Sequence, residues 1–519
     1  MIAWPRWPLA CVCVIALTAV GCGRSRDRAR AADSTITVLY PGFDERALGP
    51  YADMPSKFLV FLPLLSLNEK GEPEGRLAER WEFSPDYSTW TVHLRKDVRW
   101  HDGVPVTARD IKFTLDLLTH PDVHYHARGA YTIDVLDDQT CTITFNKLAG
   151  WPLEEWAWTV CYPKHLLEGL DPKDFMNWEF WTHPVGDGPY RYVRHVPKTM
   201  LEVEANPDYY RGKPKIEHVV LKFGALGGLT ELLSGNVDAA PVDGTDLLKI
   251  AGDRRFQAYY DLGTNDISAL ILNHRHAPFG NPRVRQALTL AINRRELLQV
   301  LNLPPKLPTF DVIFTPRQFW RGELPDPLPY DPELAKRLLE EAGWRDTDGD
   351  GVRDHGGKPF RFAALVRPAQ GQDKAAVYIQ DQLRRVGVQM EVQTLERMQA
   401  RLLGGKFEAA IYLTNFSGRL GHLKFFGEGS PIGYANGTVS ALLKEAWTTQ
   451  DLDADERRKM DAIYRRLMPI FQADLPLTYL YPACFYTAAH RRVHGLSSPH
   501  RADPVWYMED LWLENRSGQ

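Results

Sequence analysis

The sequence predicts a fold that combines strands and helices in more than one domain, and three observations support this prediction. The chain has 519 residues, which is enough for two or three domains with a large core. Residues 89–118 have the pattern of a strand, a turn and a capped helix, and residues 379–392 that of a helix followed by a strand. Hydrophobic residues make up 44% and charged residues 25% of the chain, as in ordinary globular proteins.

The first 21 residues have the features of a secretory signal peptide. Arg6 is the only charged residue before the apolar run 9–20, which is shorter than the roughly 20 residues that span a bilayer. Residues 19–22, Ala-Val-Gly-Cys, resemble a bacterial lipobox with Ala19 in place of the usual leucine. This resemblance implies that Cys22 becomes a lipid-modified N-terminus; a plain secreted protein that is cleaved nearby is the alternative.

Residues 22–34 are expected to form a disordered tether. Residues 24–30 contain four arginines and no large apolar side chain, so the segment has nothing to bury and would be attracted to anionic head groups. The formal net charge of the whole chain is -4, which argues against nucleic acid as its partner.

The first strand is expected at residues 35–40, where β-branched and apolar residues gather. In residues 89–100, Trp90, Val92 and Leu94 alternate with polar residues, which is the pattern of a half-buried strand. Thr107 can then cap a helix with Asp110 at its third position. Residues 131–145 read as a hairpin around an Asp-Asp turn.

Two segments in this region allow more than one interpretation. The five tryptophans within residues 151–181 could form a platform for a ring-shaped ligand, or they could pack in the core of a small domain. His120, Asp122, His124 and His126 could gather around a metal ion, but their spacing favours a solvated loop.

Two later helices carry clear start signals. Asn281 is placed to cap a helix with Pro282 in its first position, and Asp331 and Pro332 repeat this arrangement. Gly343 is placed to end the second of these helices. A helix followed by a strand is expected in 379–392.

The acidic loop 346–354 partly matches a calcium-binding loop. Asp346, Asp348, Asp350 and Asp354 occupy positions 1, 3, 5 and 9 of the pattern, but position 12 is Gly357 instead of a glutamate. Because the bidentate ligand is missing, a polar surface turn is favoured over a calcium site, and no metal is expected.

The sequence contains no common enzyme motif. We find no G-x-S-x-G, H-E-x-x-H or Walker A motif, and no G-x-G-x-x-G after a strand. No catalytic residue and no cofactor are therefore expected. Cys141, Cys161 and Cys484 remain beyond the signal peptide and Cys22, and they allow either a Cys141–Cys161 disulfide or three buried free thiols.

Two sequence blocks resemble a known family. Residues 77–86 read L-A-E-x-W-E-x-S-x-D, and residues 91–110 read T-V-H-L-R-K-x-V-x-W-H-D-G-x-P-V-T-A-x-D. Both blocks resemble the signature of the family 5 extracellular solute-binding proteins, which are the oligopeptide and dipeptide receptors of ABC importers. Residues 185–190, V-G-D-G-P-Y, resemble a further family motif, with Asp187 where members typically have threonine. The resemblance covers about residues 35–500.

The resemblance implies an α/β fold of the periplasmic-binding-protein type, similar to type II, with two lobes and an extra small domain. The lobes would be joined by a hinge. The implied division is a signal peptide in 1–21, a tether in 22–34, a discontinuous first lobe in 35–69, 176–269 and 491–519, a small domain in 70–175, and a second lobe in 270–490.

The implied function is capture of a peptide or another small polar solute by hinge closure, with delivery to an ABC permease and its ATPase. The protein would be a monomer, lipid-anchored in the periplasm or at the cell surface, and no enzyme. A sensor or scaffold of the same fold and a secreted hydrolase are the alternatives. The ligand-binding residues expected from the resemblance are Phe43, Asn265, Arg275, His276, Phe416, Arg419, His422 and Tyr434.

One departure bears on the ligand. Peptide receptors of this family hold the ligand's ammonium group with an aspartate after a strand that corresponds to residues 407–413 here. Residues 414–422 contain no acid. Because a buried ammonium group without an opposite charge is costly, the sequence favours an anionic or neutral polar ligand near Arg419 and His422.

Overall fold

The computed structural model describes residues 34–41, 48, 54–68, 73–86, 88–123, 131–145, 159–224, 227–305, 307, 311, 325–367, 371–395, 398–415, 418–449, 454–498 and 501–514. The side chains of 54, 67, 263–266, 414–415, 418–421 and 454 are not part of this description. Within these ranges, no helix has both the length and the apolar character that a membrane crossing would require.

The described residues build a mixed ten-stranded sheet in the order β16-β15-β17-β12-β18-β11-β1-β10-β9-β8. Parallel pairs join β1 to β10 and β11, and β15 to β16 and β17, whereas the other pairs are antiparallel. The strands are β1 Thr35–Tyr40, β8 Tyr190–Val196, β9 Met200–Ala205, β10 His218–Phe223, β11 Ala239–Val242, β12 Phe256–Leu272, β15 Arg361–Val366, β16 Gln389–Thr394, β17 Ala409–Asn415 and β18 Leu477–His490.

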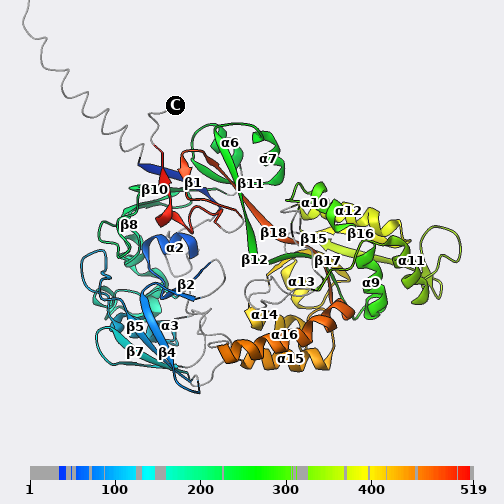
Figure 1. The fold of residues 1–519 in the computed structure, drawn as a ribbon, viewed down its shortest axis with the longest axis horizontal. Helices are drawn as coiled ribbons and strands as arrows, with labels where there is room; N and C mark the ends of the chain where they lie inside the picture. The colour runs from blue at the N-terminus through cyan, green and yellow to red at the C-terminus, as the bar shows by residue number, and fades with distance from the viewer. Residues whose placement is uncertain are drawn as a thin grey trace, which may run out of the picture.

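Strands β12 and β18 connect the two halves of the molecule (Figure 1). Residues Tyr486–Ala489 of β18 pair with β11 in the first half, whereas Asp266–Leu272 of β12 pair with β17 in the second half. The two strands also pair with each other, and their register shifts between Leu262 and Ile267. Here the first half means β1 and β8–β11 with the small sheet below, and the second half means β15–β17 with helices α8–α16.

A four-stranded antiparallel sheet, β4-β5-β7-β6, forms a separate layer within the first half (Figure 1). Its strands are β4 Ala78–Phe83, β5 Thr89–Leu94, β6 Tyr131–Val135 and β7 Thr140–Phe145, and helix α3 spans Ala108–Leu118. The predicted hairpin and the capping box of Thr107 and Asp110 are confirmed. Strand β5 ends at Leu94, earlier than Trp100, because Arg95 leaves the ladder and its amide donates to the carbonyl of Leu77.

Helices cover the sheet of the second half, and their predicted caps are confirmed. The side chain of Asn281 accepts a hydrogen bond from the amide of Arg283, and that of Asp331 from the amide of Leu334. Gly343 follows α11 with a φ of 87°, which favours glycine. The helices are α8 Ala277–Gly280, α9 Pro282–Leu290, α10 Arg294–Val300, α11 Pro332–Glu341, α12 Gln372–Arg384, α13 Gln399–Leu403, α14 Gly418–Phe426, α15 Gly437–Thr448 and α16 Ala454–Asp474.

The remaining elements are short. They are α2 Met54–Val60, β2 Leu65–Leu67, β3 Pro73–Gly75, α5 Lys164–Leu167, η1 Pro172–Asn177, η2 Glu179–Thr182, α6 Gly228–Leu233, α7 Gly244–Ile250, β13 Asp354–His355, β14 Lys358–Pro359, β19 Val493–His494, η3 Met508–Asp510 and β20 Trp512–Leu513.

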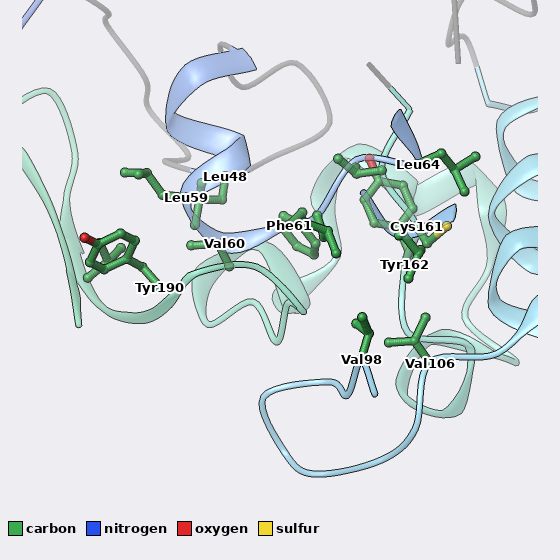
Figure 2. Close-up of a cluster of buried hydrophobic side chains, with 14 of the residues drawn as sticks. Leu48, Leu59, Val60, Phe61, Leu64, Val98, Val106, Cys161, Tyr162 and Tyr190 are labelled. Carbon is green, nitrogen blue, oxygen red and sulfur yellow. The ribbon is translucent and has the colours of Figure 1, made fainter. Parts of the chain in front are cut away.

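The apolar cores follow the two halves. Within the first half, one large cluster runs without a break from β1 and β8–β10 into the small sheet. Figure 2 shows the part of this cluster around Val60, Phe61 and Tyr162. Two other clusters belong to the second half and lie against β12, β15 and β17. Each half therefore has its own buried core, which is the condition for two bodies that move as units.

Several open alternatives can be compared with these cores. Trp178 and Trp181 are buried in the first cluster, as the core interpretation expects, whereas the other three tryptophans lie outside the described residues. His124 and His126 also lie outside them, and His120 is exposed beside Asp122. The structure holds Cys141 and Cys161 as buried free thiols, and Cys484 as a half-buried one.

Candidate functional site

The candidate site is the region where β12 and β18 pass between the halves. Asp266 of β12 pairs with Asn415 at the end of β17, so the segment after β17 begins beside the crossing strands. Asn265 lies in β12 within this region, and the helix α14 that follows β17 contains Arg419 and His422. The side chains of Asn265 and Arg419 are outside the described part of the chain, as are Phe43, Phe416 and Cys22 entirely.

His422 is buried in the second half. Only 2% of its surface is exposed, and burial lowers the pKa of its ring to about 3. The ring is therefore neutral at physiological pH. In this conformation His422 offers no positive charge to a ligand.

The side chain of Arg275 binds a neighbouring loop. Its guanidinium donates to the carbonyl oxygens of Ser430 and Pro431, each at 2.8 Å. A Cβ atom at Gly433 would lie 2.7 Å from the Cγ atom of Arg275, so the loop passes so close that glycine is needed there. Arg275 thus holds the loop that contains Tyr434 against the end of β12.

Tyr434 takes part in the same framework. Its hydroxyl donates to Oδ2 of Asp474 at 2.7 Å, and Nδ2 of Asn436 donates to the same oxygen at 2.9 Å. The ring stacks on Phe471 and meets the ring of His274 edge-on. Only 5% of the residue Tyr434 is exposed, so its side chain fixes the fold of the loop around it.

The two histidines beside Arg275 differ in their surroundings. Nε2 of His274 donates to the carbonyl oxygen of Pro476 at 3.1 Å, and burial, together with the charge of Arg285, lowers the pKa of the ring to about 4. His276 is the residue just before helix α8, and its Nδ1 lies 4.0 Å from a carboxylate oxygen of Glu408. His276 is the more accessible of the two, with 41% of its side chain exposed.

The structure adds two residues that the sequence did not indicate. Asp261 and Phe485 lie directly opposite each other on β12 and β18, so their side chains share one face of the crossing strands. Phe485 is 44% exposed, and burial together with the charge of Asp503 raises the pKa of Asp261 to about 6. Phe485 stands in an apolar run that reads as a buried strand, so its exposure has no local sequence signal.

The opposite face of these strands is covered. The hydroxyl of Tyr486 donates to the carbonyl oxygen of Asn302 at 3.3 Å, just beyond helix α10. A Cβ atom at Gly244, the first residue of α7, would lie 2.8 Å from the same oxygen. Helices α7 and α10 therefore meet behind the crossing strands, and the face with Asp261 and Phe485 is the one turned away from them.

The acidic loop forms a surface turn. Carboxylate oxygens of Asp346, Asp348 and Asp350 all lie within 4.8 Å of one another, and the three residues are exposed. The carboxylate of Asp346 accepts hydrogen bonds from the amides of Gly349 and Gly351, and that of Asp354 from Thr347. The hydrogen bonds from Thr347 lower the pKa of Asp354. The acids hold the turn, and the first three could also offer oxygen ligands to a cation.

Comparisons with known proteins agree with this architecture. A family model described as "Bacterial extracellular solute-binding proteins, family 5 Middle" matches residues 72–422. The oligopeptide-binding protein AppA of Bacillus subtilis is 25% identical over 484 residues, which are 88% of this chain and 86% of AppA. A putative ABC transporter peptide-binding protein of Brucella ovis is 30% identical over 298 residues, 56% of either chain.

The crystal structure of a putative peptide-binding protein AppA from Clostridium difficile has the same fold. Its TM-score is 0.79 at 21% identity, and the match covers 92% of this chain and all of the other. The two-lobe periplasmic-binding-protein fold expected from the sequence is thus confirmed. The chain belongs to the bacterial extracellular solute-binding proteins of family 5, which work outside the cytoplasm as solute receptors of ABC importers and are not enzymes.

Proposed function

We propose that this receptor captures a peptide or another small polar solute between its two halves and closes on it by bending at β12 and β18. The observation that carries the proposal is that each half has its own apolar core, while two long strands connect the halves. A solute that contacts both halves stabilises the closed state by those added contacts.

The register shift supports a hinge at this place. Regular pairing of β12 with β18 is interrupted between Leu262 and Ile267, so the ladder is weakest where the strands leave the first half. Contacts of Asn302 with Tyr486 and Gly244 lie on the back of the strands and would form the pivot. Closure would then bring the opposite face, with Asp261 and Phe485, against the solute.

The ligand chemistry that fits this face combines an apolar and a polar group. Phe485 offers a partly exposed ring, and Asp261 becomes negatively charged as the pH rises through about 6. This acid is close to the hinge, whereas segment 414–422 has none. Asp261 could take over charge pairing with an ammonium group, so peptides remain in the proposed ligand set. The name of the Bacillus relative, an oligopeptide-binding protein, also supports peptides.

The predicted ligand residues keep two roles in this proposal. His276, with its exposed ring, would contact the solute directly. Arg275 and Tyr434 would act through the loop 430–436, because their polar groups are bound to carbonyl and carboxylate oxygens within the second half. The contributions of Phe43, Asn265, Phe416, Arg419 and His422 are proposed from the resemblance alone.

Anchoring is part of the proposal. Cys22 would carry the lipid, and residues 23–34 would tether a monomeric receptor beside a permease that an ATPase energises. Replacement of Cys22 by serine should release the protein from membranes into the soluble fraction, with unchanged solute binding. Continued membrane retention of the Cys22→Ser variant would contradict the lipid anchor.

Native mass spectrometry and small-angle scattering together test capture and closure. Purified receptor is screened against mixed di- to nonapeptides and a panel of polar metabolites. We expect a retained solute of unchanged mass, and a smaller radius of gyration when that solute is present. If scattering stays the same with a solute bound, closure about β12 and β18 is wrong; if no solute from either panel is retained, the proposed ligand class is wrong.

A further inference from the structure

The loop 185–189 joins the small sheet to the rest of the first half. The amides of Asp187 and Gly188 both donate to the carbonyl oxygen of Val60, the last residue of α2, at 3.1 and 2.8 Å. A Cβ atom at Gly186 would lie only 1.9 Å from that oxygen, so a side chain cannot fit there. Figure 2 shows Val60 among the buried side chains of this region.

The other side of the loop is bound by His101, in the turn after β5. The amide of His101 donates to the carbonyl of Gly186 at 2.7 Å, and the amide of Gly186 donates to Nδ1 of His101 at 3.2 Å. The ring proton must therefore be on Nε2, which donates to the carbonyl oxygen of Gly188 at 3.1 Å. These bonds need a neutral ring, because protonation at Nδ1 would remove the acceptor for Gly186.

Between these two contacts, the carboxyl group of Asp187 is buried. The residue is 1% exposed, and its Oδ1 accepts a hydrogen bond from the amide of Leu62 at 2.8 Å. Its Oδ2 has no hydrogen-bond partner. Within the described part of the chain, no lysine, arginine or histidine forms an ion pair with it. In the V-G-D-G-P-Y motif this acid stands where the resemblance to the family leads us to expect a threonine.

Groups on the surrounding elements do not supply a positive charge to Asp187. Asp110 of α3 is a second acid nearby, and its carboxylate accepts from the amides of Thr107 and Lys164. Cys161 and Cys141 are buried thiols whose pKa values are raised by burial, so they stay neutral.

Three further groups point elsewhere. The ammonium group of Lys57 on α2 donates to the hydroxyl of Tyr162. Arg191 of β8, whose charge acts on His101, binds Asn206 and Asp208. Asp102 lies beside His101 and binds His165. An ionised Asp187 would therefore lack a counter-charge in the described surroundings.

We propose that Asp187 is held as the neutral acid at this junction, and that its ionisation loosens the contact between α2 and the small sheet. The junction would then act as a pH-sensitive clamp. When the loop opens, water reaches the carboxyl group and solvates its ionised form. Opening is therefore coupled to the release of one proton.

The direction in which pH changes the stability of the junction follows from the pKa values of Asp187 and His101. Burial, and then the charge of Asp110, raises the pKa of Asp187 from 3.8 to about 8. Its contribution to the closed junction is fully present below pH 3.8 and is lost as the pH rises through about 8. Burial lowers the pKa of His101 from 6.5 to about 4, so its contribution is present above pH 6.5 and lost as the pH falls through about 4.

Between pH 4 and 6.5 the two contributions change in opposite directions and cancel. Above pH 6.5 the contribution of Asp187 dominates, so the junction should weaken from there to about pH 8. Opening should become about eightfold easier over the whole interval, because His101 is still half protonated in the open state at pH 6.5 and Asp187 is half ionised in the closed state at pH 8.

Hydrogen exchange followed by mass spectrometry tests this on the full mature chain. The opening equilibrium of peptides that contain residues 60–62 and 185–189 is measured from pH 5 to 9, after correction for intrinsic exchange rates. The variant Asp187→Asn keeps the acceptor for Leu62 but cannot ionise, and Asp187→Thr is a second variant in case asparagine impairs folding. Asp134→Asn, at an exposed position of β6, removes one charge from the same sheet and is the control.

The wild-type protein and Asp134→Asn should open about eightfold more readily at pH 8 than at pH 6.5. Asp187→Asn and Asp187→Thr should not open more readily over this interval, and their junction should loosen as the pH falls from 6.5 to about 4, because only His101 then titrates. The proposal is overturned if wild-type opening is independent of pH above 6.5, or if the Asp187 variants keep the wild-type slope.

Discussion

Arg492 and Asp238 form a buried ion pair in which Nε and Nη2 of the arginine both lie 2.8 Å from Oδ1 of the aspartate. The second carboxylate oxygen accepts a hydrogen bond from the amide of Thr37 at 2.9 Å, and Arg492 also donates to the carbonyl of Thr35. One pair therefore ties the end of β18 to β1 and to the start of β11.

Substitution of Asp238 by alanine should destabilise the protein strongly. It would leave the guanidinium of Arg492 buried without its counter-charge, a loss that typically costs about 3–5 kcal/mol. We expect a decrease of this size in the free energy of unfolding from urea titration. Asp116→Ala removes one partner of an exposed pair with Lys112 and is the control, with an expected change of about 0.5 kcal/mol or less. Equal effects of the two substitutions would contradict a buried, structural role.

Arg275 provides a second prediction, which separates a structural role from direct ligand contact. Arg275→Ala removes two charge-assisted hydrogen bonds to the loop 430–431 and should lower the free energy of unfolding by about 1–2 kcal/mol. Arg275→Lys cannot reproduce the forked geometry and should lose part of that stability. Urea titration measures both.

Calorimetry with an identified solute then distinguishes the roles. If Arg275 has only a structural role, solute affinity and the free energy of unfolding should fall in parallel in Arg275→Ala and Arg275→Lys. A large loss of affinity in Arg275→Lys at nearly unchanged stability would show direct contact with the solute instead.

The elements that the sequence predicted well have local signals. Thr107 with Asp110, and Asn281 with Pro282, satisfy the first amides of a helix from within the same turn, so their role is independent of distant packing. The alternating strands of the small sheet are similar, because apolar residues at every second position have only one face to bury.

The roles of site residues depend on contacts between distant parts of the chain. Arg275 binds carbonyl groups 155 and 156 residues away, and backbone carbonyls have no sequence signature. Asp187 could be recognised as a departure from the family threonine, but its burial depends on Val60, 127 residues before it. Phe485 is exposed in a strand whose other residues are mostly buried, so its exposure depends on which distant elements cover that face of β18.

Asp261 should make stability depend on pH in a way that asparagine removes. Burial and Asp503 raise its pKa from 3.8 to about 6, so its contribution to stability is present below pH 3.8 and lost as the pH rises through about 6. Asp261→Asn should therefore raise the free energy of unfolding by about 1 kcal/mol at pH 7.5, after allowance for its partial exposure, and leave it unchanged at pH 3.5. Thermal melts at the two pH values measure this difference.

Asp503→Asn provides the matched test for Asp261, since it removes the neighbouring charge and leaves Asp261 in place. The pH at which stability declines should then move below 6, towards the ordinary value for an aspartate. An identical profile in wild type and Asp261→Asn would show that this carboxyl group is not coupled to folding.

Phe485 should contribute to solute capture more than to stability. Because 44% of the residue is exposed, replacement by alanine leaves a small cavity at most, and we expect a loss of about 1 kcal/mol or less in unfolding free energy. Loss of an aromatic contact across a closed interface costs roughly 1–2 kcal/mol, so solute affinity in calorimetry should fall about tenfold. Leu248→Ala, at a 62% exposed position on α7 behind the crossing strands, should leave affinity unchanged. Equal affinities of Phe485→Ala and wild type would place the solute elsewhere.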